Sequence, residues 1–418
     1  MNFEESADYL YSLGNEVETM KLGLENIRTL LGTLGDLQKK YLKVQVAGTN
    51  GKGSVCAFLD SICLQARIKT GVFTSPHLVS ITERVRIEGV DISEDEFARI
   101  ATRVREVSEK LVSRGELETV PTYFEQVTAI ALVAFAEAKV RLAILETGLG
   151  GRFDAVTAAE AEICAITRID LDHQEYLGNT IAEIAAEKAA VIRSDSTVVI
   201  GDQTEEAMEV IRARCREQGV DPRFAISERS RSLPPVILPE SLGLAGRYQV
   251  ENAKVAIVVG ERLKERFPIS TQNIIDGLQK ARNPGRLEWI GSFLLDGAHN
   301  IGGAKALRAY LDEYVDRSVT LVFGAMKDKD VDRIAEVLFP KAEKVVLTQP
   351  ANSRAMTSEE LVEAIPSEID DDRLVRTRSV SEALTVAQEV SAEDGIILIA
   401  GSLYLVGEAR RILTHQRG

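Results

Sequence analysis

The feature that most constrains the fold of this chain is a short apolar strand followed directly by a glycine-rich turn, in the run VQVAGTNGKGS at residues 44–54. Glycine lets a backbone adopt angles that other residues resist, and it lets that backbone approach a bulky anion. Amides at the start of the next helix would point at the anion, with the helix dipole behind them. The run therefore predicts a nucleotide phosphate loop, although a strand-to-helix turn without a ligand is the alternative. The predicted phosphate-binding residues are Gly48, Thr49, Asn50, Gly51, Lys52, Gly53 and Ser54.

The length and charge of the chain limit its architecture and its partners. Its 418 residues are too many for one ordinary core. Because Asn283-Pro284-Gly285 follows a helical stretch, we expect two domains, residues 1–282 and 283–418. The formal net charge of −14 disfavours nucleic acid or an anionic membrane as a partner, since both require a basic surface. An anionic substrate would therefore be held by local cations.

The cysteines and the amino terminus indicate the compartment. Cys56, Cys63, Cys164 and Cys215 lie in apolar or helical patterns without the spacing of a metal site, so we expect reduced, buried thiols. The amino terminus lacks the basic and apolar plan of a signal peptide. No run approaches the roughly 18 apolar residues of a membrane span. These features predict a cytoplasmic protein.

Strand-like runs alternate with helical patterns along almost the whole chain, which is typical of parallel sheets with helices on both faces. The predicted fold class is therefore α/β. In such open sheets, ligands bind beyond the carboxyl ends of the strands. The expected strands cover residues 44–47, 70–73, 142–146, 163–166, 197–200, 321–323, 344–347 and 396–400, with a short hairpin at 287–290 and 293–296.

Three polar clusters come directly after expected strands. Residues 74–78, which include Ser75, form either a capped turn or part of a site. Glu146 stands at the tip of its strand, where a carboxylate beside a phosphate loop commonly holds magnesium. Asp170-Leu171-Asp172-His173 places two carboxylates beside an imidazole, a set that suits either a metal or a hydrogen-bonded turn.

Lys188 occupies an unusual place for a lysine. It lies on the apolar stripe of a helix predicted at residues 181–193, so its amine is expected to be partly desolvated. Desolvation favours the neutral amine, which can act as a base or react with carbon dioxide to form a carbamate. The alternative is a snorkelling lysine whose stem covers apolar surface.

Three further segments carry candidate site residues. Residues 122–125 form either a helix capping box or part of a substrate-binding wall. Residues 283–286 and 296–300 carry polar groups that could meet a nucleotide. Asn300 is at least as well suited to cap a helix that starts at Ile301.

Taken in order, these segments resemble the folylpolyglutamate synthase and dihydrofolate synthase family, a branch of the Mur-type ATP-dependent amide ligases. The resemblance implies an amino-terminal P-loop ATPase domain with a mostly parallel sheet, a smaller Rossmann-like carboxyl-terminal domain, and chemistry in the cleft between them. The matching residues extend over nearly the whole chain: 47–54, 74–78, 146–154, 171–178, 187–189, 284–286, 296–300, 323–330 and 401–405.

The resemblance also implies roles for individual residues. Lys52 would sit at the terminal phosphates of ATP, and Lys52, Lys188 and His173 would be catalytic. A carbamate on Lys188 could hold a second magnesium ion. ATP would further contact Asn252, Arg286, Asp296 and His299; magnesium would be held by Ser75, Glu146 and His173; and the pterin would contact Thr122, Tyr123, Phe124, Glu125, Arg152, Phe153 and Asp154.

The implied reaction is the addition of L-glutamate to a folate, or to dihydropteroate, through an acyl phosphate made with ATP by a monomeric enzyme. Phe153 stands where the family usually has leucine, and Val156-Thr157 replace a threonine-asparagine pair, so the fit around the pterin is open. Two other interpretations remain. One is a Mur-type ligase for peptidoglycan precursors, which residues 74–78 and Gly150-Gly151 argue against by resemblance. The other is a P-loop ATPase switch without ligation.

Overall fold

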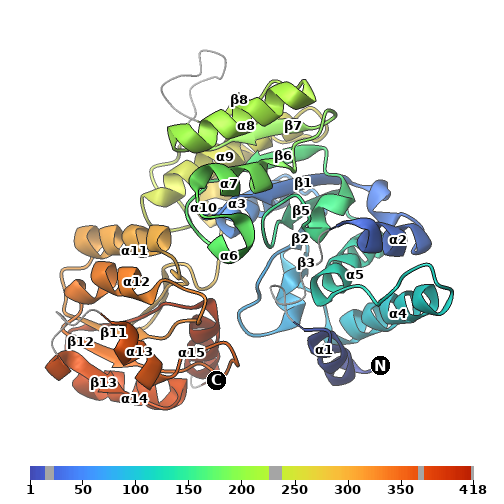
Figure 1. The fold of residues 1–418 in the computed structure, drawn as a ribbon. Coiled ribbons are helices and arrows are strands. Elements are labelled where there is room, and N and C mark those ends of the chain that lie inside the picture. Colours follow the sequence, from blue (N-terminus) through green and yellow to red (C-terminus); the bar gives the residue numbers. More distant parts are fainter. Residues whose placement is uncertain (15–22, 226–237, 366–370, 416–418) are drawn as a thin grey trace. The chain divides into compact units, whose positions relative to one another are not determined.

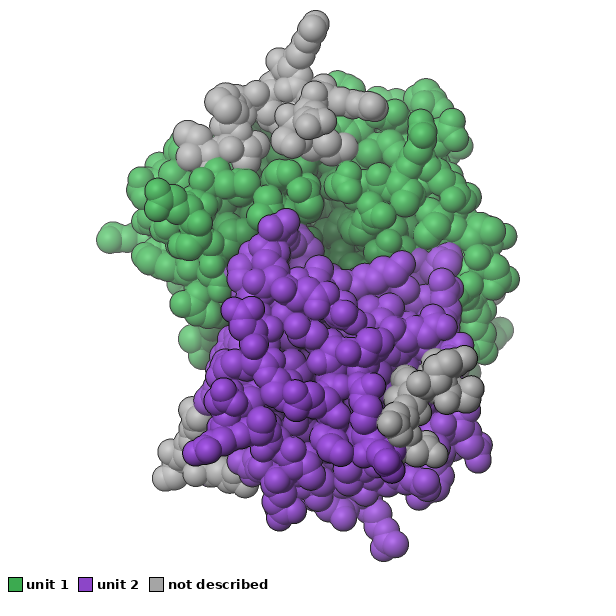
Figure 2. All heavy atoms as spheres, turned by 90° about the vertical axis from the view of Figure 1, so that its left-hand side faces the viewer, with its two compact units in different colours: residues 1–170, 174–243, 250–282 green, residues 171–173, 244–249, 283–418 purple. Residues whose placement is uncertain are grey.

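Two sheets, each with its own helices, divide the chain into two units (Figure 1). The computed structural model describes residues 1–14, 23–225, 238–365 and 371–415. Unit 1 comprises residues 1–170, 174–243 and 250–282, and unit 2 comprises residues 171–173, 244–249 and 283–418, as coloured in Figure 2. The predicted division into 1–282 and 283–418 differs in two short segments: it assigns residues 171–173 and 244–249 to the first domain, whereas they belong to unit 2.

The sheet of unit 1 is mostly parallel. Strand β1 lies at its centre between β5 and β6, and only β3 and β4 run antiparallel to their neighbours. The register pairs Val46 with Glu146 and Ala47 with Ile166, so the carboxyl ends of these strands meet at one edge. The strands, in spatial order, are β4 (Val90–Asp91), β3 (Val85–Ile87), β2 (Thr70–Phe73), β5 (Leu142–Glu146), β1 (Leu42–Ala47), β6 (Ile163–Ile166), β7 (Thr197–Ile200) and β8 (Arg223–Phe224).

The helices of unit 1 fill the connections between these strands. Helix α3 is buried on nearly every side from Ser54 to Cys63, which is expected of a helix enclosed within a core. Gly277 of α10 allows that helix to pack closely on it, because an added Cβ would lie 2.4 Å from the Cα of Ile62. The helices are α1 (Phe3–Ser12), α2 (Glu25–Thr33), α3 (Lys52–Gln65), α4 (Glu94–Ser113), α5 (Tyr123–Glu137), α6 (Gln174–Leu177), α7 (Ile181–Ala189), α8 (Glu205–Gln218), α9 (Tyr248–Leu263) and α10 (Thr271–Lys280). The first two residues of α9 belong to unit 2.

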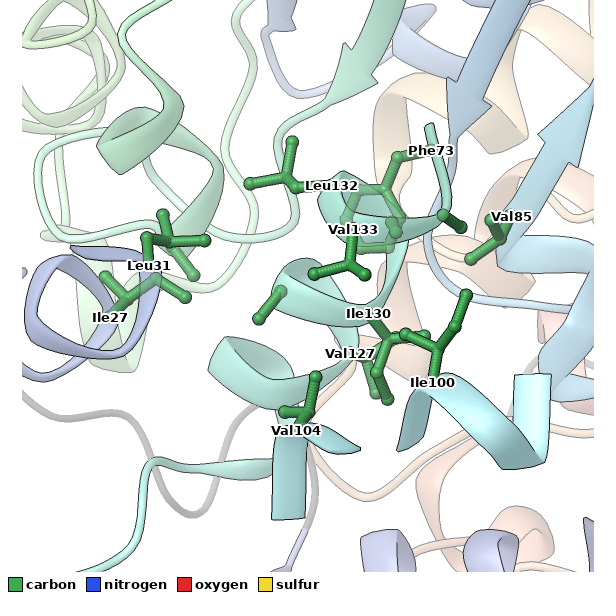
Figure 3. Close-up of a cluster of buried hydrophobic side chains, with 14 of the residues drawn as sticks. Ile27, Leu31, Phe73, Val85, Ile100, Val104, Val127, Ile130, Leu132 and Val133 are labelled. Atoms are coloured by element: carbon green, nitrogen blue, oxygen red, sulfur yellow. The ribbon is translucent and has the colours of Figure 1, made fainter. Parts of the chain in front are cut away.

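A second part of the unit 1 core gathers around α5. Helix α5 is buried from Val127 to Phe135, and α4 packs against it through Ile100 and Val104 (Figure 3). Burying one such side chain fully contributes about 1.5–3 kcal/mol, so this cluster fixes α5 firmly. The start of α5, at Tyr123, is thereby held in place.

Unit 2 has a smaller sheet of the same kind, in which only β9 is antiparallel to its neighbour. Leu295 pairs with Ile399 and Phe323 with Ala400, so the carboxyl ends of β10, β14 and β11 also meet at one edge. The strands, in spatial order, are β13 (Leu374–Arg376), β12 (Lys344–Leu347), β11 (Val319–Phe323), β14 (Ile396–Ala400), β10 (Phe293–Leu295) and β9 (Glu288–Ile290); the helices are α11 (Ile301–Tyr314), α12 (Val331–Leu338), α13 (Ser358–Ala364), α14 (Val380–Val390) and α15 (Leu403–His415).

The predicted α/β class is confirmed, and every expected strand is present with bounds that agree to within two residues. The four cysteines are free and buried, as expected. The helix predicted at residues 181–193 ends earlier, at Ala189. Within the described ranges, no helix combines the length and the apolar character needed to cross a membrane.

Candidate active site

The predicted phosphate loop connects β1 to α3, and its glycines are required by geometry. Gly48 has a φ of +148° and Gly51 a φ of +92°, which side chains rarely permit. An added Cβ on Gly51 would also lie 2.2 Å from the Oδ1 of Asn252. The structure therefore brings Asn252, predicted to contact ATP, against the loop. Helix α3 begins at Lys52, so its first amides and its dipole are available to an anion beside the loop.

The loop is held in this shape by the segment after β6. The backbone amides of Thr49 and Asn50 both donate to the carbonyl of Arg168, at 2.9 and 3.1 Å. The Nδ2 of Asn50 donates to the carboxylate of Asp170 at 2.9 Å, and the amide of Asp170 donates to the Thr49 hydroxyl at 3.1 Å. Asp170 therefore acts in a hydrogen-bonded turn, one of the two interpretations of its cluster.

Two lysines converge on one carbonyl of the loop. The Nζ of Lys52 donates to the carbonyls of Gly48 and Thr49, each at 3.1 Å. The Nζ of Lys188, on α7, donates to the same Gly48 carbonyl at 2.9 Å, and its side chain is 4% exposed. Lys188 is thus buried, as its stripe position predicts, and it does not snorkel to water. Both amines therefore lie beside the loop.

Glu146 and Ser75, two of the predicted magnesium ligands, are neighbours at the ends of β5 and β2. The backbone amide of Ser75 donates to a carboxylate oxygen of Glu146 at 3.3 Å, and Glu146 is buried. These two residues carry a carboxylate and a hydroxyl, oxygen ligands of the kind that magnesium prefers, and magnesium keeps several waters in such sites. The residues present fit this ion. In the described part of the chain, no three His, Cys, Asp or Glu side chains form a metal-binding group.

His173, the third predicted ligand, belongs to unit 2 with Asp172. Its backbone adopts a φ of +50°, and its amide donates to the Asp172 carboxylate at 2.9 Å. The same carboxylate accepts from the Nζ of Lys329 at 2.9 Å and from the Nδ2 of Asn300 at 2.9 Å. Burial opposes ionisation of Asp172, but the charges of His173, Lys329 and His299 hold its pKa well below its usual range. Asp172 thus also lies in a hydrogen-bonded turn.

Residues at the strand ends of unit 2 shape a second polar cluster. Asp296, after β10, accepts from the backbone amides of Leu287 and Ala298, both at 2.9 Å, and burial raises its pKa. The Nδ1 of His299 lies 2.7 Å from the carbonyl of Gly297, so this nitrogen carries the proton. Burial lowers the pKa of His299 to about 4, which leaves the imidazole neutral near pH 7.

Arg286 and Asn300 complete this cluster. A Cβ added to Gly297 would lie 3.0 Å from a guanidinium nitrogen of Arg286. The guanidinium charge opposes the rise in the pKa of Asp296. Asn300 caps α11, because its Oδ1 accepts from the amide of Gly303 at 2.8 Å, so the capping interpretation of this residue is confirmed.

The predicted pterin-contacting residues of α5 fall into two groups. Thr122 and Glu125 form a reciprocal capping box, which is the structural interpretation of this segment. Tyr123 is buried, and its ring stacks on that of Tyr11 with centroids 6.0 Å apart. Phe124 lies over Gly148, where an added Cβ would come within 2.6 Å of its ring.

The loop of residues 148–154 connects these aromatic residues with α7. Arg152 pairs with Glu187 of α7 at 2.8 Å. The carboxylate of Asp154 accepts from the amides of Leu149 and Val156, both at 2.9 Å, and so closes the loop on itself. Phe153 is 37% exposed, which makes it one of the large apolar side chains that the surface presents.

Sequence reasoning did not assign a role to Lys329 or to the pairing of Asp172. Lys329 lies in the run KDKD after β11, and its nearest acid in sequence, Asp328, is also a partner, at 3.2 Å. A lysine among acids usually signals a solvated turn, so the run alone did not reveal that the side chain is 9% exposed.

Comparisons with known proteins agree with this architecture. Residues 46–260 match the Mur ligase middle domain, and residues 285–403 match the Mur ligase glutamate ligase domain. The chain is similar to a folylpolyglutamate synthase of Mycobacterium tuberculosis solved in complex with ADP, at 30% identity and a TM-score of 0.90, over 98% of each chain.

Two further relatives extend this similarity. A bifunctional folylpolyglutamate synthase/dihydrofolate synthase of Yersinia pestis, solved with AMPPNP and Mn ion, is 28% identical with a TM-score of 0.84, over 99% of this chain and 98% of that one. A probable bifunctional folylpolyglutamate synthase/dihydropteroate synthase of Haloferax volcanii is 34% identical over 99% of this chain. The chain spans about half, 51%, of the length of that relative.

Proposed function

Because the chain belongs to the folylpolyglutamate synthase/dihydrofolate synthase family of Mur ligases, we propose that it is an ATP-dependent ligase that adds L-glutamate to folates or to dihydropteroate. The observation that carries the proposal is the convergence of Lys52 and Lys188 on the Gly48 carbonyl. It places the Lys52 amine and the first amides of α3 beside the loop that would hold a triphosphate, and it sets a buried lysine next to them.

We propose that residues 1–282 bind ATP and the pterin acid, and that residues 283–418 serve the glutamate and supply Arg286, Asp296 and His299 as further ATP contacts. Asn252 lies against the phosphate loop, which supports its role toward ATP. For Arg286, Asp296 and His299, the support is their place at the strand ends of unit 2 and the matched glutamate ligase domain. The protein would act as a monomer in the cytoplasm, where its buried thiols stay reduced.

The reaction must first make a carboxylate reactive. A carboxylate is a poor electrophile because its oxygen is a bad leaving group. Transfer of the terminal phosphoryl group of ATP to that oxygen breaks the bond between the β- and γ-phosphates and gives an acyl phosphate and ADP. The amine of L-glutamate, having lost a proton, then attacks the acyl carbon, the bond to phosphate breaks, and an amide forms.

The residues of this chain contribute mainly position and charge, as is usual in phosphoryl transfer. Lys52 would stay close to the γ-phosphate as charge moves onto it, and the first amides of α3 would bind the remaining phosphate oxygens. Ser75, Glu146 and His173 would hold magnesium, which neutralises phosphate charge when bound. A carbamate on Lys188 would turn a cation into an anionic ligand for a second ion, and its burial supports this chemistry.

The pterin would lie near the start of α5 and the loop of residues 148–154. Phe124 and Phe153 offer apolar rings there, and Arg152, which pairs with Glu187 of α7, lies beside them in the loop. Thr122, Glu125 and Asp154 would shape this region through their hydrogen bonds to the backbone. Tyr123 is buried, so it would support this region through packing rather than through contact with the substrate.

Product analysis by mass spectrometry tests the proposal. The protein is incubated with ATP, magnesium and L-glutamate, with dihydropteroate in one reaction and a reduced folate in the other. We expect a product heavier by one glutamyl residue in at least the folate reaction, with ADP formed in equal amount. ATP hydrolysis that needs neither glutamate nor a pterin acid would instead indicate an ATPase switch and contradict the proposal.

A further inference from the structure

One buried side chain of the central strand holds both ends of the loop of residues 148–154. Gln45 lies in the middle of β1, paired with Leu145 of β5 and Cys164 of β6, and it is fully buried. Its Nε2 donates to the hydroxyl of Thr147 at 3.1 Å and to the hydroxyl of Thr157 at 2.8 Å. Thr147 directly precedes the loop, and Thr157 follows it. A single amide group in the core therefore ties together the two sides of the loop.

Thr157 also forms a hydrogen bond to a residue of the loop itself. The hydroxyl of Thr157 donates to the carbonyl of Gly151 at 2.7 Å. Gly151 is tightly placed on α7, since an added Cβ would approach the carbonyls of Glu187 and Lys188 to 2.8 and 2.9 Å. The chain of hydrogen bonds from Gln45 through Thr157 therefore fixes the point at which the loop turns. Arg152 and Phe153 follow that point directly.

Stability alone does not account for a glutamine at this position. The Oε1 of Gln45 is buried and has no hydrogen-bond partner within the described part of the structure, and an unsatisfied buried acceptor costs free energy. Its neighbours Val44 and Val46 are apolar and fully buried. An apolar side chain of similar size would remove that cost, but it would leave Thr147 and Thr157 without their donor.

We propose that Gln45 and Thr157 are positioning residues that set the conformation of the loop of residues 148–154 and, through it, the affinity for the pterin acid. The proposal rests on the proposed function, in which Arg152 and Phe153 contact that substrate. In this chain the Thr157 hydroxyl both accepts from Gln45 and donates to Gly151.

Steady-state kinetics on four variants tests this proposal. Gln45→Met and Thr157→Val each remove one partner of the chain of hydrogen bonds, and Thr157→Ser keeps the hydroxyl. Thr128→Val is the matched control, because Thr128 is a buried threonine of the same unit whose hydroxyl has no partner among the described residues. For each, KM is measured for the pterin acid and for ATP, together with kcat and the melting temperature.

We expect KM for the pterin acid to rise about tenfold in Gln45→Met and in Thr157→Val, the usual size for a lost buried hydrogen bond. KM for ATP should change less than about twofold. Thr157→Ser and Thr128→Val should match the parent protein. The double variant Gln45→Met/Thr157→Val should be no worse than either single variant, because both act through one connection.

Other results overturn the proposal. An unchanged KM for the pterin acid in folded Gln45→Met or Thr157→Val contradicts it, as does an equal rise in KM for ATP, which would indicate a structural role only. If Gln45→Met fails to fold, the comparison of Thr157→Val with Thr157→Ser tests the proposal by itself. A parent protein that forms no glutamylated product refutes the proposed function, whereas an active parent with unaffected variants refutes only this inference.

Discussion

Lys52 in unit 1 and Lys329 in unit 2 occupy similar places, shortly after β1 and β11, but their charges are used differently. Lys52 donates to two backbone carbonyls, and no carboxylate of the described residues lies within ion-pair distance of it. Lys329 lies between Asp172 and Asp328, at 2.9 and 3.2 Å. Carbonyl dipoles hold a cation without cancelling its charge, whereas two carboxylates neutralise it. The first lysine is therefore available to an anionic ligand, and the second is committed to holding the fold.

This comparison predicts that the strongest kinetic effect comes from Lys52. We expect Lys52→Ala to lower kcat/KM on the order of 1,000-fold, because the charge at the transferring phosphoryl group is lost. The melting temperature should change little, since no carboxylate loses a partner. The assay is ADP release coupled to product formation. Lys39→Ala, which removes an exposed lysine paired with Asp36, serves as the control. Near-normal turnover by Lys52→Ala would contradict the assignment of Lys52 to an anionic ligand and of Lys329 to a structural role.

Breaking the pair in unit 2 should instead cost stability. We expect Asp172→Asn to lower the free energy of unfolding by about 3 kcal/mol, because it leaves a buried cation less compensated. Urea denaturation measures this change. Asp312→Asn, which breaks the largely exposed pairs with Arg308 and Lys341 in the same unit, should cost less than about 1 kcal/mol. Equal effects of the two variants would contradict the structural role assigned to Asp172.

Glu146 is a carboxylate of unit 1 that, unlike Asp172 of unit 2, is proposed to bind a ligand. We expect Glu146→Ala to lower kcat about 100-fold, a loss typical of removing one charge-stabilising group. The magnesium concentration that gives half-maximal rate should rise at the same time. A titration of activity with magnesium measures both quantities. A variant with an unchanged magnesium requirement would show that Glu146 is not a ligand.

A variant of Lys188 tests whether this lysine acts as a carbamate, which is an anion, rather than as a cationic amine. If it acts as a carbamate, Lys188→Ala should lose activity by about 10-fold or more, and short carboxylic acids such as acetate should restore part of it. Lys52→Ala should not respond to the same acids, because its missing group is a cation. Activity measured against acid concentration separates the two variants. Full activity of Lys188→Ala without any acid would exclude the carbamate.

Asp60, a buried acid of α3, gives the smallest expected effect and contrasts with Asp172. Burial raises the pKa of Asp60, although a hydrogen bond from Thr70 and the charge of Arg86 oppose the rise. A carboxyl whose folded pKa is raised stabilises the fold when protonated and loses this contribution as pH rises through that pKa. Asp60→Asn should therefore be more stable than the parent at pH 7, on the order of 1 kcal/mol.

The pH dependence of this gain is the check. Urea denaturation at pH 7 and at pH 4.5 should show a gain that shrinks at the lower pH, because the parent carboxyl then approaches protonation. A gain of the same size at both values would show that ionisation of Asp60 does not carry the effect.

Much of the fold could be predicted from the sequence because buried parallel strands form continuous apolar runs. The strands at Thr70–Phe73, Leu142–Glu146 and Thr197–Ile200 were predicted with their observed bounds. The strands β3, β4, β8 and β13 were not predicted, because each has only two or three residues and none is fully buried. Val90 of β4, for example, is 69% exposed. Such short strands, at or next to the edge of a sheet, depend on their neighbours rather than on their own pattern.

The candidate site could be predicted only where chemistry follows directly from local sequence. The phosphate loop and Glu146 each stand at the end of an apolar run, so strand order alone brings them to one edge. The partnership of Asp172 with Lys329 joins residues 157 positions apart, and no local pattern reports it. Gln45 was missed for a similar reason, because its two partners lie 102 and 112 positions away.

The three separate passages of chain that build unit 2 have a consequence for recombination between relatives. Residues 171–173 and 244–249 are encoded within the stretch that otherwise forms unit 1. A chimera joined at residue 283 would combine the Lys329 of one parent with the Asp172 of the other. Exchange of the whole unit therefore needs five crossovers, and a single junction succeeds only between parents that share this ion pair.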